Sequence, residues 1–386
     1  MRIFYQSPVA QDWIRQRPHF MAEGLAAAGH QVFWFYAAAF TKCRFRRFDN
    51  GHGLTGIELP VLPFASRFRL FEWLNRLWIS WWLRHVRADV VIATNPVALP
   101  WLPNRLAKIP LVYDCMDVQT AFFTGRRLRR MIETERALVH EACAIVASSD
   151  VIRNKLIDYY SPKNVMLTVV PNGIQLSEPE SVAAPVQVSH PSIAYFGTIA
   201  PWFDWNGVMD AAVRHPEWRF DLFGPCDGRT PALPANVALR GSIPHDAVLA
   251  QARAADVLVM PFVRNDLIDG VDPVKMYEYL RTGRPIVSSW WPLLEKFRRF
   301  EAVSFYGRGD SLSDCLAASL AGPRSFPVPE SFLAGNSWAE RVKSLDDVVI
   351  EGVSNQKEKD NLSRSPSCRA CWRRRKYDII RDNEGN

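Results

Sequence analysis

Residues 272–288 are the most informative part of the sequence: Asp272-Pro-Val-Lys275-Met-Tyr-Glu278-Tyr-Leu-Arg-Thr-Gly283-Arg-Pro-Ile-Val-Ser288. Its pattern predicts a helix over 274–282 followed by a strand over 285–288, because proline suits a first helical turn and glycine a helix end. Lys275 and Glu278 are three residues apart and therefore share one face of that helix. Such a pair offers a cation for a diphosphate and an acceptor for ribose hydroxyls. An ordinary surface ion pair is the alternative.

Two glycine turns precede this stretch. Gly197 and Thr198 directly follow an expected strand over 192–196, and Gly224 follows another over 219–223. Glycine at the end of a strand lets backbone N–H groups approach phosphate oxygens, although it is as often only a tight turn. In α/β sheets, loops at the carboxyl ends of the strands are where ligands bind.

The rest of the chain repeats the same alternation of strands and helices, which predicts parallel sheets. We expect an α/β protein with two doubly wound, Rossmann-like halves that face a cleft. The predicted organisation is a first domain over 1–174, a linker over 175–191, a second domain over 192–350 and a disordered basic tail over 351–386.

Composition agrees with a folded protein of two domains: 386 residues, 48% hydrophobic and 23% charged. Seven cysteines without framework spacing favour reduced thiols, and Cys368 and Cys371 form one pair without further ligands, so we expect no metal site. The N-terminus lacks the pattern of a signal peptide, and no stretch is apolar enough for a spanning helix. The basic tail lacks aromatic patterning, and we expect no nucleic-acid partner.

The second half resembles GT-B glycosyltransferases, in particular bacterial exopolysaccharide and teichuronic-acid-type enzymes with the pattern D-P-x-K-x-x-E-Y-L-x-x-G-x-P-I-V. The likeness covers roughly residues 1 to 345, and Arg17-Pro-His19-Phe is similar to the opening loop and helix of such enzymes. It implies that Glu278 binds the donor ribose and Lys275 the diphosphate.

The same resemblance implies that Gly197 and Thr198 hold the phosphate end of the donor, and Gly224 lies on the next loop. Many retaining relatives carry a further glutamate eight positions before Glu278, where this chain has Gly270. Asp269 and Asp272 are therefore candidates for the missing carboxylate, and Asp272 is assigned to the donor site. The resemblance also implies a metal-independent reaction without a cofactor.

The acceptor side is expected at Tyr113-Asp114-Cys-Met-Asp117, an apolar strand that ends in two carboxylates. A carboxylate there could take the proton of an acceptor hydroxyl as a general base. Asp117 is the first choice, followed by Asp114. Either carboxylate could instead cap a helix or pair with arginines over 126–130. His19 is a third catalytic candidate, which could equally be satisfied by backbone at a helix start.

Residues from Phe64 to Arg87 interleave tryptophan, phenylalanine and leucine with arginine. This composition suits an amphipathic helix in an anionic membrane interface, and an ordinary core helix is the alternative. We therefore expect a cytoplasmic enzyme, peripheral at the inner membrane, that moves a sugar from a UDP-sugar to a lipid-linked or polysaccharide acceptor. A sugar-nucleotide epimerase or hydrolase, or a non-catalytic nucleotide-sugar-binding protein, remains the alternative.

Overall fold

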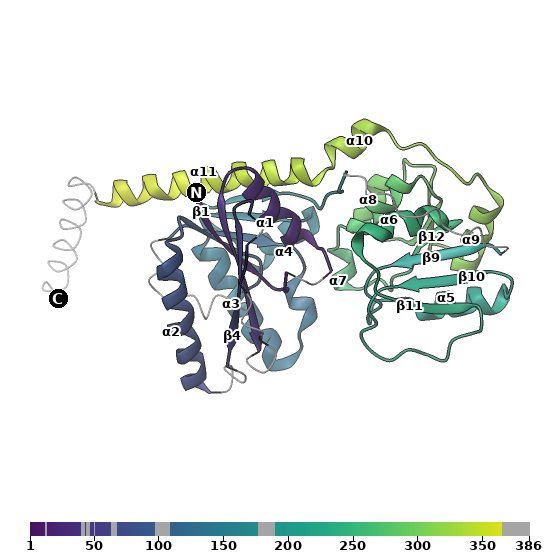
Figure 1. The fold of residues 1–386 in the computed structure, drawn as a ribbon, viewed down its shortest axis with the longest axis horizontal. Helices are drawn as coiled ribbons and strands as arrows, with labels where there is room; N and C mark the ends of the chain where they lie inside the picture. The colour runs from purple at the N-terminus through teal and green to yellow at the C-terminus, as the bar shows by residue number, and fades with distance from the viewer. Residues whose placement is uncertain are drawn as a thin grey trace, which may run out of the picture.

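The computed structural model describes residues 1–11, 14–39, 43, 47–49, 51–62, 68–96, 109–176 and 190–364. Two β-sheets with helices on both faces lie side by side along the long axis of the molecule (Figure 1). This confirms the predicted α/β class with two Rossmann-like halves. No helix in the described ranges is long and apolar enough to cross a bilayer.

The first sheet contains eight strands in the order β3-β4-β2-β1-β5-β6-β7-β8. All neighbours pair in parallel except β3, which runs antiparallel to β4. The strand bounds are β1 Arg2–Ser7, β2 Gln31–Ala39, β3 Arg47–Asp49, β4 Leu54–Val61, β5 Val90–Ala93, β6 Leu111–Cys115, β7 Ala144–Ala147 and β8 Met166–Val169. The helices of this half are α1 Arg17–Ala27, α2 Arg69–Val86, the short η3 Gln119–Phe122, α3 Gly125–Glu141 and α4 Asp150–Tyr160.

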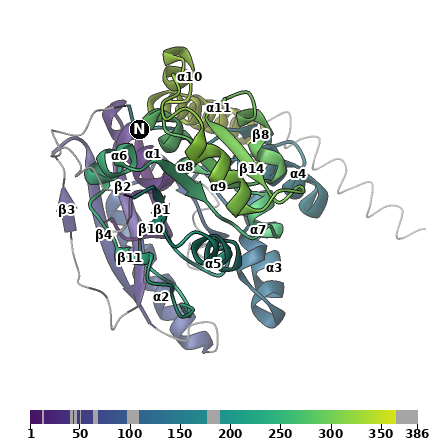
Figure 2. The ribbon, with the colours of Figure 1, turned by 90° about the vertical axis from the view of Figure 1, so that its right-hand side faces the viewer.

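The second sheet contains six parallel strands in the order β11-β10-β9-β12-β13-β14. Its strands are β9 Ser192–Phe196, β10 Arg219–Phe223, β11 Val237–Gly241, β12 Val257–Met260, β13 Ile286–Ser289 and β14 Val303–Tyr306. Its helices are α5 Trp205–Arg214, α6 His245–Ala254, α7 Asp266–Asp269, α8 Val274–Thr282, η4 Pro292–Phe297, α9 Leu312–Ala321 and α10 Glu330–Gly335. Helices α5 and α9 pack together, and the end-on view in Figure 2 shows them side by side.

The order of the strands places the switch point of the second sheet between β9 and β12, because connections leave these two strands in opposite directions. In open parallel sheets, the crevice outside such a point is where ligands bind. The loop after β9 begins at Gly197, and the segment after β12 leads into α8. The fold therefore brings both ends of the predicted donor motif to one crevice.

Helix α11, Trp338–Arg364, returns from the second half and lies along the first (Figure 1). Its side chains Val342, Leu345 and Val349 are buried in the same cluster as Ile3 and Leu25. Trp338 stacks on Phe20 of α1 with ring centroids 4.6 Å apart. The final helix is thus part of the core of the first half.

This packing corrects the predicted organisation at the C-terminal end. Residues 338–350 were assigned to the second domain, and a disordered tail was expected from residue 351. Instead, the helix continues to Arg364, and Val353 is 3% exposed. The reason is that an apolar cluster on the first sheet buries these side chains. The remainder of the predicted tail, and most of the predicted linker, lie outside the described residues.

Candidate active site

Helix α8 carries the donor motif and forms for local reasons. Pro273 precedes it with extended backbone, and Gly283 ends it in the left-handed conformation, at φ 69°. A side chain on Gly283 would also meet the carbonyl of Phe326 at 3.0 Å. The hydroxyl of Tyr279 accepts a hydrogen bond from the backbone N–H of Phe196, at 2.9 Å. The helix is therefore fixed to the strand whose end carries the first glycine turn.

Lys275 extends from α8 across the Gly197 turn. A methyl group on Gly197 would collide with Cε of this lysine, and one on Gly224 would collide with the carbonyl of Gly197. Both glycines have φ values, 146° and 134°, that L side chains rarely adopt. The N–H of Gly197 donates to Phe223 O at 2.8 Å, which holds the two turns together. The structure thus brings Gly197, Gly224 and Lys275 together, with half-buried Thr198 beside them.

The Lys275 ammonium has no carboxylate within 4.0 Å among the described residues. Its nearest aromatic neighbours are Phe262, at 5.8 Å from the ring centroid, and Tyr195, at 6.0 Å. Burial lowers the pKa of Lys275, and the charge of Glu278 opposes that change. A half-buried cation that lacks an ion-pair partner at two glycine turns is able to bind an anion.

Glu278 lies one turn further along α8. Burial raises the pKa of its carboxyl to about 7, while the positive charges of Lys275 and Arg281 act in the opposite direction. Within the described ranges, its carboxylate accepts no hydrogen bond. Its two oxygens are therefore available to vicinal hydroxyls of a ligand.

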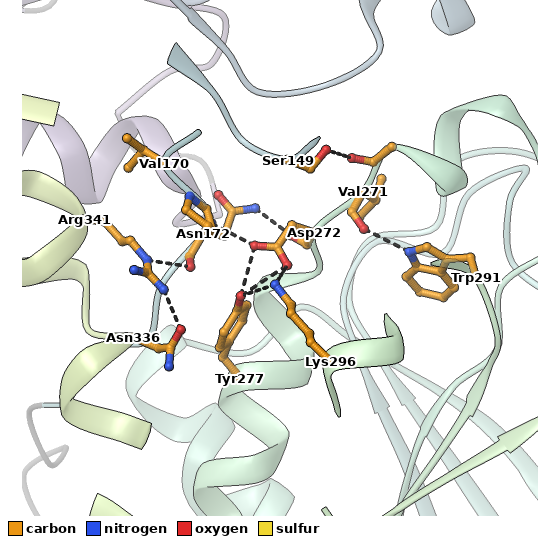
Figure 3. A network of polar contacts seen from close by, with 12 residues as sticks. Ser149, Val170, Asn172, Val271, Asp272, Tyr277, Trp291, Lys296, Asn336 and Arg341 are labelled. Carbon is orange, nitrogen blue, oxygen red and sulfur yellow. Dashed lines mark hydrogen bonds and ion pairs between the residues drawn. The ribbon is translucent and has the colours of Figure 1, made fainter. Parts of the chain in front are cut away.

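Asp272 does not belong with these residues, contrary to the sequence prediction. It is 2% exposed and accepts hydrogen bonds from the backbone N–H of Asn172 at 2.9 Å and from Lys296 Nζ at 2.7 Å. The Tyr277 hydroxyl donates to it as well, at 3.1 Å to Oδ2 (Figure 3). Its oxygens are occupied by protein donors, so it is a structural carboxylate and has none to offer a donor sugar.

The other candidates for the missing carboxylate are also accounted for. Asp269 pairs with Arg264, whose Nε lies 2.6 Å from Oδ1. Gly270 is buried, and a side chain there would collide with Val118 of the first half. Close packing between the halves therefore leaves no room for a glutamate at this position.

On the acceptor side, Asp114 is also structural. Its side chain is fully buried, and Arg17 Nη2 lies 2.8 Å from its Oδ1, with Nε at 3.1 Å from both oxygens. The predicted catalytic role of Asp114 does not agree with this geometry, because a buried carboxylate whose oxygens are paired with an arginine cannot contact an acceptor. The arginines over 126–130 are not its partners.

Asp117 lies two residues beyond the end of β6 and is half-buried. Burial raises the pKa of its carboxyl to about 6; the charge of Arg17 lowers it and that of Asp114 raises it. The carboxylate accepts no hydrogen bond from the described residues, and it lines a small pocket that Gln119 and Lys155 also border. A carboxyl with this pKa can gain and lose a proton near neutral pH, as a general base must.

His19 is buried in the first turn of α1, where its ring lies against Trp34 with centroids 4.9 Å apart. Its Nδ1 accepts the backbone N–H of Gln16 at 3.2 Å in a capping box. Burial lowers the pKa of this imidazole. The contact of Nδ1 corresponds to the alternative interpretation, a helix-start residue satisfied by backbone, whereas the buried Nε2 has no hydrogen-bond partner among the described residues. A catalytic role for His19 stays a prediction.

Sequence reasoning missed Asn172 and Lys296, which both contact Asp272. Asn172 is the middle residue of Pro171-Asn-Gly173, a sequence typical of a turn. No local pattern distinguishes an asparagine that serves a turn from one that bonds a residue 100 positions away. Among the described residues, no three His, Cys, Asp or Glu side chains gather as a metal site would require.

Two Rossmann-like halves with a lysine over the glycine turns of the second are the arrangement that the resemblance to GT-B glycosyltransferases implies. The sucrose-phosphate synthase of Thermosynechococcus elongatus superposes with a TM-score of 0.64 at 15% identity, over 94% of this chain and 99% of that one. HepE of Anabaena in complex with UDP-glucose gives a TM-score of 0.62 at 13% identity, over 94% and 99%. These likenesses establish the fold.

Sequence comparison points to the same class. Residues 19–178 match the model of Glycosyltransferase Family 4. TuaH of Bacillus subtilis (strain 168), whose name assigns it to teichuronic acid biosynthesis as a glycosyltransferase, is 24% identical over 348 residues, 80% of this chain and 85% of that protein. The chain is a glycosyltransferase of the GT-B class.

Proposed function

We propose that this enzyme transfers a sugar from a UDP-sugar to a hydroxyl of a lipid-linked or polysaccharide acceptor in the synthesis of cell-surface polysaccharide. One observation supports the donor half of this proposal above all: Lys275 crosses the Gly197 turn without an anionic partner among the described residues. A diphosphate supplies the missing negative charge. The UDP-glucose in the structure of HepE favours a UDP-sugar, and the name of TuaH favours a cell-surface polysaccharide as the product.

The geometry supports the following roles. Lys275 binds the diphosphate beside Gly197, Thr198 and Gly224, and Glu278 accepts the ribose hydroxyls. The acceptor oxygen forms a bond to the anomeric carbon as the bond from that carbon to the diphosphate breaks, and Asp117 takes the hydroxyl proton. Lys275 stabilises the charge of the departing diphosphate, so the proposal requires no metal ion.

Calorimetric titration with UDP, GDP and their glucose conjugates tests the donor site. We expect UDP to bind and Lys275→Ala to weaken its affinity by about 10- to 100-fold, the value of a charge-assisted contact. Lys343→Ala removes an exposed lysine of α11 and serves as the matched control. Equal UDP affinity in both variants and the wild type would reject the donor assignment.

We further propose that α2 docks the enzyme onto an anionic membrane surface. Its outer side exposes a set of large apolar residues: Leu70, Trp73, Leu74, Leu77, Trp78 and Trp81. Arg130 lies 3.8 Å from Glu72, which places the start of α3, with exposed Arg126 and Arg127, beside the start of α2. Tryptophan and arginine together suit the headgroup region of an anionic bilayer.

Vesicle sedimentation tests this surface. The wild type should bind vesicles that contain phosphatidylglycerol more strongly than pure phosphatidylcholine vesicles, and Trp73→Ser with Trp81→Ser should reduce that binding by about 10-fold or more. The control pair Val213→Ser with Ile350→Ser removes exposed apolar residues elsewhere. Loss of binding in the control pair alone, or no binding by the wild type, would contradict docking through α2.

A further inference from the structure

Asn172 lies where the chain leaves the first sheet, and its polar groups contact both halves of the enzyme. Its backbone N–H donates to Asp272 Oδ2 at 2.9 Å, and its Nδ2 donates to the Asp272 carbonyl at 2.6 Å. Its Oδ1 accepts from Arg17 Nη1 at 3.3 Å, and its carbonyl accepts from Arg341 Nε at 3.1 Å. A flexible linker between the two halves would not require hydrogen bonds from every polar group of one of its residues.

The Arg17 side of this arrangement reaches the proposed general base. Arg17 is 4% exposed at the start of α1, and its other nitrogens hold Asp114, three residues before Asp117. Its Nη1 also donates to the carbonyl of Val170 at 2.8 Å. A planar guanidinium with five donors fixes its partners in direction as well as distance. Arg17 therefore fixes the end of β6 relative to the segment that leaves the first sheet at Val170.

The Asp272 side reaches the donor helix. Asp272 lies two residues before α8 begins and three before Lys275. The adjacent segment is held from the first half as well, because Ser149 Oγ donates to the Gly270 carbonyl at 3.0 Å and Lys155 Nζ to that of Asp266 at 3.2 Å. Figure 3 shows Asn172 and Arg341 to the left of Asp272, with Tyr277 and Lys296 below it.

We propose that Asn172 is a positioning residue that sets the placement of the donor helix α8 relative to the acceptor-side carboxylate Asp117. The inference rests on the proposed function and adds a specific device to it. Asp114, Arg17, Asn172 and Asp272 form one continuous line of hydrogen bonds between the two half-sites. A misplacement of about 1 Å between reacting groups can cost 100-fold in rate, so this register matters for transfer and not for donor binding.

Asn172→Ala tests the proposal through a difference between two kinetic parameters. The turnover number for transfer should fall by about 10- to 100-fold. UDP affinity should stay within about twofold, because the residues proposed to bind the donor all lie on the second half. Slow hydrolysis of the UDP-sugar by water should fall less than transfer does, since water requires no placed acceptor. Asp272→Asn removes the charge at the other end of the contact and should show the same pattern.

Asn236→Ala is the matched control. Asn236 also uses its amide for several contacts, to the carbonyls of Ala212, His215 and Trp218 at 3.0 to 3.1 Å, but all of them lie within the second half. Its loss should lower stability without changing the ratio of transfer to hydrolysis. The same ratio in the Asn172 and Asn236 variants would overturn the positioning role.

A distance measurement separates this inference from the proposed function. Spin labels are placed on unnatural amino acids at exposed Glu133 and Val213. Double electron–electron resonance then measures the distribution of distances between the two halves. Asn172→Ala should broaden that distribution and Asn236→Ala should not, whatever reaction the enzyme performs. An unchanged distribution in Asn172→Ala would refute the proposal even if transfer activity is found. A broadened one without any sugar transfer would refute the proposed function alone.

Discussion

The donor side and the acceptor side of the enzyme are built in different ways. The proposed donor residues Lys275 and Glu278 come from one helical turn, and that helix is pinned by Tyr279 to the strand before Gly197. The surroundings of Asp117 depend instead on Arg17 and Asp114, which are 97 residues apart. A site whose residues lie close together in the sequence can be recognised from the sequence. A site whose residues are distant in the sequence can be recognised only from the folded structure.

The largest expected effect separates the two sides. Asp117→Asn removes the proposed base and should lower the turnover number for transfer by about 10²- to 10⁴-fold, because that is the usual contribution of general-base catalysis. Donor affinity should not change. Single-turnover kinetics alongside calorimetry measure both quantities, and full activity in this variant would remove Asp117 from the mechanism.

The neighbouring carboxylate, Asp114, should affect stability and not only activity. Asp114→Asn leaves the Arg17 guanidinium buried without its ion-pair partner, and we expect the free energy of unfolding to fall by about 3–5 kcal/mol. Denaturant titration at pH 7 measures it. A loss below about 1 kcal/mol would show that the pair is not held as described.

Asp117→Asn should have the opposite effect on stability. A carboxyl with a pKa of about 6 in the folded protein and 3.8 when unfolded binds its proton more tightly in the folded state. Ionisation therefore destabilises the fold: the penalty is absent below about pH 3.8, grows as pH rises and is complete above about 6. At pH 7.5 we expect a gain of about 1–3 kcal/mol, which chemical denaturation measures. No gain there, or an equal gain at pH 4, would contradict the raised pKa.

The smallest expected effect tests the donor side. A Glu278 carboxyl with a pKa of about 7 should bind ribose hydroxyls better when ionised. UDP-glucose affinity should therefore rise severalfold between pH 6 and pH 8, a range in which the ligand itself does not titrate. Glu278→Gln should abolish that rise, and Glu351→Gln, at an exposed position on α11, should keep it. A wild type without any pH dependence would argue against Glu278 as the ribose ligand.

Much of the fold could be predicted because its signals are local. The ranges of β9, β10 and α8 agree with the sequence prediction, since each has a recognisable apolar pattern that ends at a glycine. Edge strands such as β11, whose outer residues are exposed, lack that pattern and were missed. The residue types alone could not reveal that Asp272 bonds Asn172, or that it is thereby unavailable to a donor.

The two carboxylates of the acceptor loop illustrate the same limit. Sequence places Asp114 and Asp117 at the end of one strand but cannot say which of them finds a buried arginine. The decision depends on α1, whose first residue, Arg17, points across the sheet to Asp114. Similarly, the apolar residues of α11 indicate a helix, yet nothing local indicates that its neighbours belong to the other end of the chain.

Because α11 packs on the first half, the order in which the chain is synthesised affects the order in which it folds. The amino-terminal half emerges from the ribosome first, but its apolar cluster includes Val349 and Val353, which are among the later residues to be synthesised. Until they arrive, the surface of α1 and the first strands has to remain uncovered. Domains usually fold in the order of synthesis, whereas here the half that begins the chain has to be completed after the half that follows it.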